Sequence, residues 1–160
     1  MDIKIEENLV VINFKANNRD EVITELAKLL WKEGCVKESF LNAVLEREKR
    51  YPTGLPTLPV AIAIPHTDAE HCLHSAVAIA TLQEPVKFAL MSDDTTTVDA
   101  KAVFLLSLDR SQERAVFLSN FSELIGNAGN LERVLNASTR SEVIKICVSV
   151  LDPDLGSRSE

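Results

Sequence analysis

The sequence predicts a single α/β domain in which a mixed β-sheet is flanked by helices on both faces. The chain has 160 residues, and 46% of them are hydrophobic, so it can form one core without disulfides or a structural metal. Apolar runs of strand length occupy the middle of the chain, between helical patterns toward each end. Some of these runs follow one another too closely for a crossover helix, which indicates that antiparallel pairs accompany the parallel ones.

The first third of the chain predicts one strand and two helices. Residues 8–14 form a run with high β-propensity. Asn18 and Glu21 stand three positions apart, as in a capping box, which marks the start of a helix, and Gly34 marks its end. A second helix is expected at residues 37–50. A loop rich in proline and glycine follows it, because proline cannot continue a helix.

The middle of the chain predicts the sheet. A short buried strand is expected at residues 60–64, and Pro65 ends it because proline has no N–H for the strand ladder. The next strand is expected at residues 75–82, with a short further piece at 86–90. Residues 100–108 form a continuous apolar run, which is typical of a central strand covered on both faces.

Helical patterns return in the last third, at residues 111–126 and 130–136. The pattern T-R-S-E, from Thr139 to Glu142, is a second capping box and predicts a final helix. We expect the domain to span residues 1–152 and the polar residues 153–160 to form a flexible tail.

Charge and hydropathy exclude several classes of function. The formal net charge is −7, whereas a protein that binds the phosphate backbone of nucleic acid presents a basic surface. No apolar run approaches the roughly 20 residues that span a bilayer, and the acidic first residues do not resemble a signal peptide. We therefore expect a cytoplasmic protein without a nucleic acid partner and without direct membrane insertion.

The three histidines, His66, His71 and His74, fall within nine residues of one another, in the segment A-I-A-I-P-H-T-D-A-E-H-C-L-H. His66 follows a strand and a proline, so it should emerge at the carboxyl end of that strand, where ligands usually bind in α/β sheets. A neutral imidazole nitrogen is a nucleophile suited to accept a phosphoryl group, provided that an acceptor holds the other ring nitrogen. Asp68 is expected to cap a turn of helix at residues 69–73, whose free N–H groups would suit that group.

The sequence leaves two other interpretations of these histidines open. A histidine after a strand is often structural, and His71 and His74 then belong to the polar face of a turn. Alternatively, the three histidines form a metal site with Asp68 and Cys72, although the spacing H-x₄-H-x₂-H matches no strong zinc motif. The three cysteines of the chain form no C-x-x-C pair, which argues against a disulfide framework and a cysteine zinc site. We expect no metal and no cofactor.

Arginines are available to face a phosphoryl group on His66. Arg47 belongs to the cluster R-E-K-R that ends the second predicted helix, where positive charge also suits the helix dipole. The functional interpretation is that Arg47 turns toward the sheet edge and binds phosphate oxygens. Arg110 and Arg114 open the helix after the central strand and are expected at the same edge.

With these residues in view, the sequence resembles the enzyme IIA domains of the bacterial phosphoenolpyruvate-dependent sugar phosphotransferase system, of the fructose–mannitol class. The resemblance depends on the run R-E-K-R-Y-P-T-G-L, which begins at Arg47, and on A-I-A-I-P-H-T-D around His66. The long loop P-T-G-L-P-T-L-P-V and the downstream T-D-A-E-H look most like the galactitol branch of this class. The likeness covers most of the chain.

The resemblance implies that the protein is a phosphotransferase that carries phosphohistidine. His66 would accept a phosphoryl group from the histidine phosphocarrier protein and pass it to a cysteine of an enzyme IIB, which serves a membrane enzyme IIC. Thr53 would shape the loop beside the site. The residues expected to stabilise the phosphoryl group are Arg47, Thr53 and Arg114, with His71 and Asp68 in support.

One position departs from the family pattern. Mannitol-type domains carry a second histidine beside the active one, and Arg114 occupies that position here. Arg114 cannot accept a hydrogen bond, but it can bind a phosphoryl group as a cation. Alternatively, His71 or His74 supplies the missing partner. The sequence also leaves open a regulatory module, in which the phosphorylated histidine acts on a protein partner without sugar transport.

Overall fold

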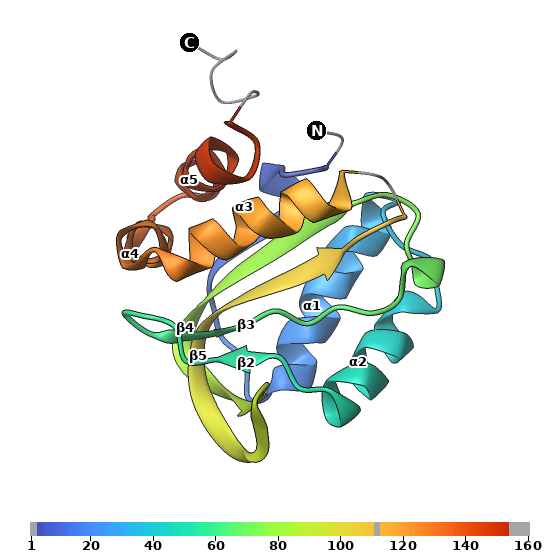
Figure 1. Ribbon diagram of the computed structural model, residues 1–160, viewed down its shortest axis with the longest axis horizontal. Helices are drawn as coiled ribbons and strands as arrows, with labels where there is room; N and C mark the ends of the chain where they lie inside the picture. The colour runs from blue at the N-terminus through green and yellow to red at the C-terminus, as the bar shows by residue number, and fades with distance from the viewer. Residues whose placement is uncertain (1–2, 111–112, 154–160) are drawn as a thin grey trace.

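The computed structural model describes residues 3–110 and 113–153 and places a five-stranded sheet between two layers of helices (Figure 1). The strands are β1 (Val10–Phe14), β2 (Gly54–Leu55), β3 (Ala61–Ala63), β4 (Ala76–Leu90) and β5 (Asp93–Ser107). Their order is β1-β4-β2-β3-β5, and β4 also pairs with β5. The pairs β1–β4, β2–β4 and β3–β5 are parallel, and the pairs β2–β3 and β4–β5 are antiparallel, which confirms the predicted mixed sheet.

Two apolar clusters hold helices to the two faces of the sheet. The helices are α1 (Arg19–Lys32) and α2 (Phe40–Arg50) on one face and α3 (Arg114–Gly126), α4 (Ala128–Asn136) and α5 (Arg140–Leu151) on the other. Strand β4 contributes to both clusters, because successive side chains of a strand point to opposite faces. Ala78 and Ala80 pack toward α1, and Val77 and Ile79 pack toward the opposite layer. Helices therefore cover both faces, as predicted.

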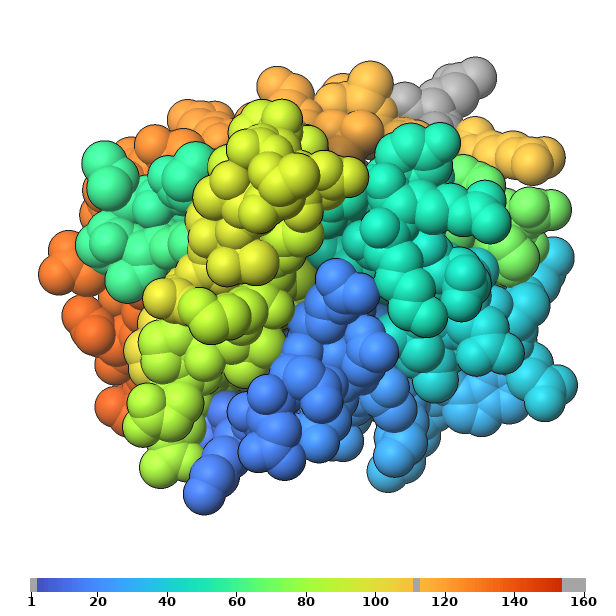
Figure 2. All heavy atoms as spheres, turned by 90° about the horizontal axis from the view of Figure 1, so that it is seen from below, coloured from blue at the N-terminus to red at the C-terminus, as the bar shows by residue number. Residues whose placement is uncertain are grey.

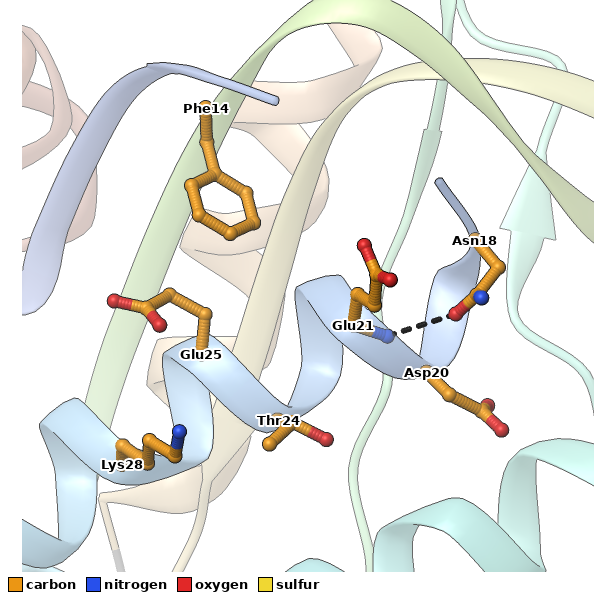
Figure 3. Close-up of a pocket in the computed structure, with 7 residues that line it drawn as sticks. All are labelled: Phe14, Asn18, Asp20, Glu21, Thr24, Glu25 and Lys28. Carbon is orange, nitrogen blue, oxygen red and sulfur yellow. Dashed lines mark hydrogen bonds between the residues drawn. The ribbon is translucent and has the colours of Figure 1, made fainter. Parts of the chain in front are cut away.

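The predicted ends of two helices are confirmed by their hydrogen bonds. The Asn18 side chain accepts the Glu21 N–H at 3.0 Å and begins α1, as Figure 3 shows. The Thr139 hydroxyl accepts the Glu142 N–H at 3.1 Å and begins α5. Gly34 has a φ of +72°, a conformation that glycine adopts readily, and it follows the end of α1. These caps satisfy N–H groups that a helix leaves unpaired at its first turn.

The β4–β5 hairpin is longer than the sequence predicts, with 15 residues in each strand. Pro85 interrupts the apolar run and lacks a ladder N–H, and the register shifts between Thr81 and Val86. The polar run S-D-D-T-T-T suggests a loop, but its β-branched threonines belong to β5, and Thr97 pairs with Ala89. Figure 2 shows the yellow-green hairpin lying across one face of the molecule, next to the teal surface of α2.

The sequence does not predict β2, because it lies in the proline-rich loop. Gly54 explains how the hairpin can pack against this loop. The Met91 N–H donates to the Gly54 carbonyl at 2.8 Å, and a Cβ at position 54 would lie only 2.6 Å from the Ala89 carbonyl oxygen. Glycine is therefore required for this close approach of two backbones.

Two further boundaries differ from the sequence prediction. Helix α2 begins at Phe40 and not at residue 37, and a turn precedes it in which the Phe40 N–H donates to the Lys37 carbonyl at 3.0 Å. The predicted start of the later helix at residue 111 and most of the predicted tail, residues 154–160, lie outside the described residues. Within the described ranges, no helix has the length and apolar character required to cross a bilayer.

Candidate functional site

His66 lies at the carboxyl edge of the sheet, three residues after the end of β3. Pro65 follows the strand, and its carbonyl accepts the Leu106 N–H at 3.1 Å. Because β3 and β5 run parallel, the carboxyl ends of both strands meet at this edge. The His66 side chain is half-buried. The chain thus places the imidazole where ligands of α/β sheets commonly bind.

One ring nitrogen of His66 is held by its own backbone. Its Nδ1 lies 2.9 Å from the carbonyl oxygen of Ile64. A carbonyl can only accept a hydrogen bond, so Nδ1 carries the proton and Nε2 keeps its lone pair. This supplies the acceptor that the sequence analysis required, and it comes from neither His71 nor His74. The imidazole is therefore oriented as a nucleophile through Nε2.

The surroundings of His66 keep its ring neutral. Burial is the largest cause and lowers its pKa, and the positive charges of Arg47 and Arg114 lower it further. The hydrogen bond to Ile64 and the charge of Asp68 act in the opposite direction without reversing the shift. An ordinary histidine titrates near ~6.5, so His66 is uncharged at neutral pH. The same positive potential that disfavours an imidazolium would favour a negatively charged group on Nε2.

Arg47 reaches the histidine loop from the last turn of α2. Its Nη1 lies 3.5 Å from Oδ1 of Asp68, and its guanidinium carbon lies 5.4 Å from the centre of the Tyr51 ring. Its Nε is buried and has no hydrogen-bond partner. Together with Thr67, Asp68 and other residues of α2 and the loop, Arg47 lines a hollow of about 300 Å³. A buried donor without a partner is costly, but this atom is covered, so an anion in the hollow would meet the exposed part of the guanidinium, whose side chain is 34% exposed.

Thr53 is buried behind the site and does not face the hollow. Its hydroxyl donates to Glu48, at 2.9 Å from Oε2 and 3.1 Å from Oε1, and its N–H donates to Oε1 at 2.9 Å. The Ile64 N–H donates to the Thr53 hydroxyl oxygen at 3.2 Å. The hydroxyl is thus engaged on both sides. This geometry favours the predicted shaping of the loop over direct contact with a phosphoryl group.

Glu48 is a residue that the sequence analysis missed. It is 1% exposed although it is a carboxylate, and burial raises its pKa while the bonds from Thr53 lower it. A signal was present in the sequence, because Phe40, Val44 and Glu48 stand four residues apart and therefore share the buried face of α2. A glutamate on the apolar stripe of a helix indicates a buried polar partner.

The expected helix cap at Asp68 is wrong. Its side chain caps no N–H and turns instead to Arg47, and the element that follows is a three-residue 3-10 helix, η2 (Ala69–His71). The N–H groups of His71 and Cys72 are used within this turn, at 3.2 Å and 3.0 Å from their acceptors. They are not available to a phosphoryl group.

His71 lines the same hollow as Arg47, and its ring nitrogens have partners other than His66. Its Nδ1 lies 2.8 Å from the Ser39 hydroxyl, and its Nε2 lies 3.6 Å from a carboxylate oxygen of Glu70. The Nδ1 atoms of His66 and His71 therefore have different partners, the Ile64 carbonyl and the Ser39 hydroxyl. Among the described residues, no set of three or more histidine, cysteine, aspartate or glutamate side chains is arranged to hold a metal ion. The geometry gives the metal interpretation no support.

Arg114 is the first residue of α3 and approaches from the layer opposite to α2. It is half-buried, and its charge contributes to the lowered pKa of His66. Arg110 precedes this helix and is exposed. The structure thus brings Arg47 and Arg114 to the surroundings of His66 from two different layers of the fold.

Another hollow, of about 480 Å³, lies on α1 and contrasts with the site at His66 (Figure 3). Its lining includes the carboxylates of Asp20, Glu21 and Glu25, with Lys28 as the cation. Carboxylates repel phosphate oxygens, so this hollow lacks the chemistry that surrounds His66. The residues around His66 combine a neutral nucleophilic nitrogen with cationic donors, which is the arrangement that phosphoryl transfer requires.

Comparisons with known proteins agree with this chemistry. Residues 4–150 match the family model described as "Phosphoenolpyruvate-dependent sugar phosphotransferase system, EIIA 2". The chain is 31% identical over 101 residues to the galactitol-specific EIIA component of Escherichia coli K12, which covers 63% of this chain and 67% of that protein. It is 28% identical over 149 residues to the mannitol-specific enzyme IIA component of Bacillus subtilis, which covers 91% and 96% of the two chains.

Two other similar proteins are a transcriptional regulator and a solved enzyme IIA structure. The chain is 31% identical over 116 residues to the transcriptional regulator ManR of Bacillus subtilis. The match covers 72% of this chain and 16% of ManR. The fold matches enzyme IIA mannitol of Escherichia coli, solved by NMR in its complex with phosphorylated enzyme IIB mannitol, with a TM-score of 0.75. That likeness covers 92% of this chain and 99% of the other, at 23% identity, and shows a shared fold.

Proposed function

This chain belongs to the EIIA 2 family of the phosphoenolpyruvate-dependent sugar phosphotransferase system, and from that membership we propose that His66 is the residue that carries the phosphoryl group. Members of the family are phosphotransferases that work through a phosphohistidine. The chain is accordingly a phosphoryl carrier of a sugar phosphotransferase system. The donor, the acceptor and the sugar are proposed in the same way.

The observation that carries the assignment is the hydrogen bond between His66 Nδ1 and the Ile64 carbonyl. It fixes the proton on Nδ1 and leaves the lone pair of Nε2 open. In the proposed step, Nε2 attacks the phosphorus of a phosphohistidine on the histidine phosphocarrier protein. The phosphorus–nitrogen bond of the donor breaks with its electron pair on the donor nitrogen, while the new bond forms at Nε2. Arg47 and Arg114 stabilise the negative oxygens during transfer.

The second half of the cycle reverses the roles. A cysteine thiolate of an enzyme IIB attacks the phosphorus, and the electron pair of the breaking bond returns to Nε2 of His66. The proton stays on Nδ1 throughout and keeps its hydrogen bond to the Ile64 carbonyl, so the ring needs no rotation between the two steps. We propose that this enzyme IIB serves a membrane enzyme IIC and that the exchange takes place in the cytoplasm.

We propose galactitol, or a related sugar, as the transported substrate. The galactitol-specific EIIA component is 31% identical to this chain over 101 residues, against 28% over 149 residues for the mannitol-specific component. The long loop P-T-G-L-P-T-L-P-V supports the same choice. Parallel transfer assays with galactitol-type and mannitol-type enzyme IIB domains test it, and faster transfer to the mannitol-type domain would contradict it.

A second candidate function is regulatory. It is favoured by the similarity to ManR, a protein described as a transcriptional regulator, over 72% of this chain. In this alternative, phosphorylated His66 alters contact with a protein partner and no enzyme IIB receives the group. Both candidates use the same site, so the fate of the phosphoryl group separates them.

The experiment that tests the assignment incubates the protein with phosphoenolpyruvate, enzyme I and the histidine phosphocarrier protein and measures its mass. We expect one phosphoryl group on the wild type and on His71→Ala, and none on His66→Ala. Circular dichroism should show that both variants are folded. If a folded His66→Ala variant still received one phosphoryl group, the assignment of His66 would be wrong.

A further inference from the structure

The carbonyl that orients His66 is itself held in place by buried groups that the proposed function does not use. The backbone is anchored on both sides of this carbonyl. On one side, the Ile64 N–H donates to the hydroxyl and carbonyl oxygens of Thr53, at 3.2 Å and 3.3 Å. On the other side, the Pro65 carbonyl accepts the Leu106 N–H at 3.1 Å. The position of the Ile64 carbonyl is therefore determined by Thr53 and by strand β5.

Thr53 in turn is bound at two points by Glu48. The carboxylate accepts the Thr53 N–H and the Thr53 hydroxyl, at distances from 2.9 to 3.1 Å. Thr53 is 3% exposed and Glu48 is 1% exposed, so water does not compete for these bonds. The network thus connects the interior of α2 to the imidazole in three hydrogen-bonded steps, from Glu48 to Thr53, to Ile64 and to His66.

When Glu48 is ionised, the donors and acceptors of this network fit together in one direction only. A carboxylate accepts hydrogen bonds and cannot donate, so the Thr53 hydroxyl must give its proton to Glu48. Its lone pair is then free to accept the Ile64 N–H. An ionised Glu48 therefore orients the hydroxyl so that its oxygen accepts the Ile64 N–H, and the hydroxyl helps the Thr53 carbonyl to hold the Ile64 backbone. A buried carboxylate is expensive unless such donors compensate it, which argues against an incidental position.

Glu48 also stands next to Arg47 in α2, and the two side chains point to different sides of the helix, about 100° apart. Arg47 faces the hollow beside the histidine loop, and Glu48 faces the core. One turn of helix therefore fixes both the cation that would meet the phosphoryl group and the backbone that orients the nucleophile. A displacement of about 1 Å between such groups can cost roughly a hundredfold in rate.

We propose that Glu48 is a positioning residue which, through Thr53 and the Ile64 backbone, fixes His66 in the tautomer with Nε2 open and sets its place relative to Arg47. The inference rests on the proposed function, because it assigns a role only if His66 carries the phosphoryl group. Glu48 does not touch the reacting atoms. Its effect is transmitted through the position and tautomer of the imidazole.

The test compares four variants by two measurements. Thr53→Val removes the hydroxyl at nearly constant volume, Thr53→Ser restores a hydroxyl, and Glu48→Gln removes one acceptor. Thr57→Val is the matched control, because it makes the same change in the same loop and its hydroxyl bonds only to the nearby Val60 carbonyl at 2.7 Å. The ¹⁵N NMR spectrum of labelled histidine reports the tautomer of His66, and single-turnover transfer from the phosphocarrier protein reports the rate.

In Thr53→Val and Glu48→Gln we expect His66 to populate both tautomers and transfer to slow by roughly ten- to a hundredfold, since the imidazole is no longer held in one place. Thr53→Ser and Thr57→Val should keep the wild-type tautomer and rate. Wild-type tautomer and rate in folded Thr53→Val and Glu48→Gln would overturn the proposal. So would failure of both variants to fold, because the network would then serve stability alone.

The result also separates this inference from the proposed function. If wild-type protein carries phosphate on His66 and the variants behave as the control does, only the positioning role of Glu48 fails. If wild-type protein is phosphorylated elsewhere, the assignment of His66 fails first, whatever the tautomer in the variants.

Discussion

The two helical layers reach His66 in different ways. From the α2 side, Glu48 is connected to His66 through Thr53 and Ile64 by hydrogen bonds, and Arg47 lines a hollow together with Thr67 and Asp68. From the α3 side, Arg114 acts on the imidazole through its charge. One layer thus supplies orientation together with charge, and the other supplies charge. Variants on the α2 side should therefore be more damaging and more specific than variants on the α3 side.

Arg47→Ala should have the largest effect of the arginine variants. It removes a positive charge and the N–H donors that face the hollow, so transfer to His66 should slow by roughly 10²–10³-fold, as when one donor of a preorganised anion site is lost. Single-turnover transfer from the phosphocarrier protein measures this.

Lys49→Ala is the matched control for Arg47→Ala, because Lys49 lies in the same helix turn and pairs with Glu46. Its rate should stay near that of the wild type. Equal losses of transfer rate in the two variants would mean that α2 contributes only electrostatic docking. The proposed difference between the two helical layers would then be wrong.

Arg114→Ala should have a smaller effect, roughly three- to tenfold, because a partly exposed charge that is screened by solvent contributes about 1 kcal/mol. Arg114→Lys should restore the rate, whereas Arg47→Lys should not, since lysine keeps the charge but lacks the planar set of donors. Transfer assays at low and high salt measure the difference. A strict requirement for arginine at position 114 would contradict a role through charge.

The smallest expected effect is on the pH profile. In the proposed transfer, neutral His66 accepts the phosphoryl group, and its pKa is below ~6.5, so transfer should stay constant as pH falls to ~6.5 and decline only below it. Asp68 raises the pKa of His66, so Asp68→Asn should move this decline to lower pH. Arg47→Ala should move it to higher pH. Shifts in the opposite directions would contradict the charge assignments.

Much of the fold was predictable because local signals and tertiary packing agree. The caps at Asn18 and Thr139 and the apolar periodicity of the helices fixed these elements directly. The hairpin and β2 were less accessible, because Pro85 and the prolines around Gly54 are normally signs of loops. Only pairing with distant residues, such as Gly54 with Leu90, makes them strands.

The site was predictable to the extent that it lies in local motifs. The position of His66 after a strand and a proline, and that of Arg47 at a helix end, follow from short stretches of sequence. The partner of Nδ1 did not follow, because it is a backbone carbonyl and backbone groups leave no mark on residue identity. Local sequence favours Asp68 as a helix cap, but its side chain pairs with Arg47 from a distant part of the chain and caps no N–H group.

The hydrogen bond from Nδ1 to the Ile64 carbonyl leads us to infer that His66 presents Nε2, and not Nδ1, to the phosphoryl donor. The most direct test is NMR of the protein labelled with ¹⁵N-histidine and phosphorylated by the phosphoenolpyruvate-dependent donors. We expect ³¹P–¹⁵N coupling to Nε2 of His66, with Nδ1 still protonated. Coupling to Nδ1, or to either ring nitrogen of His71 or His74, would contradict the account.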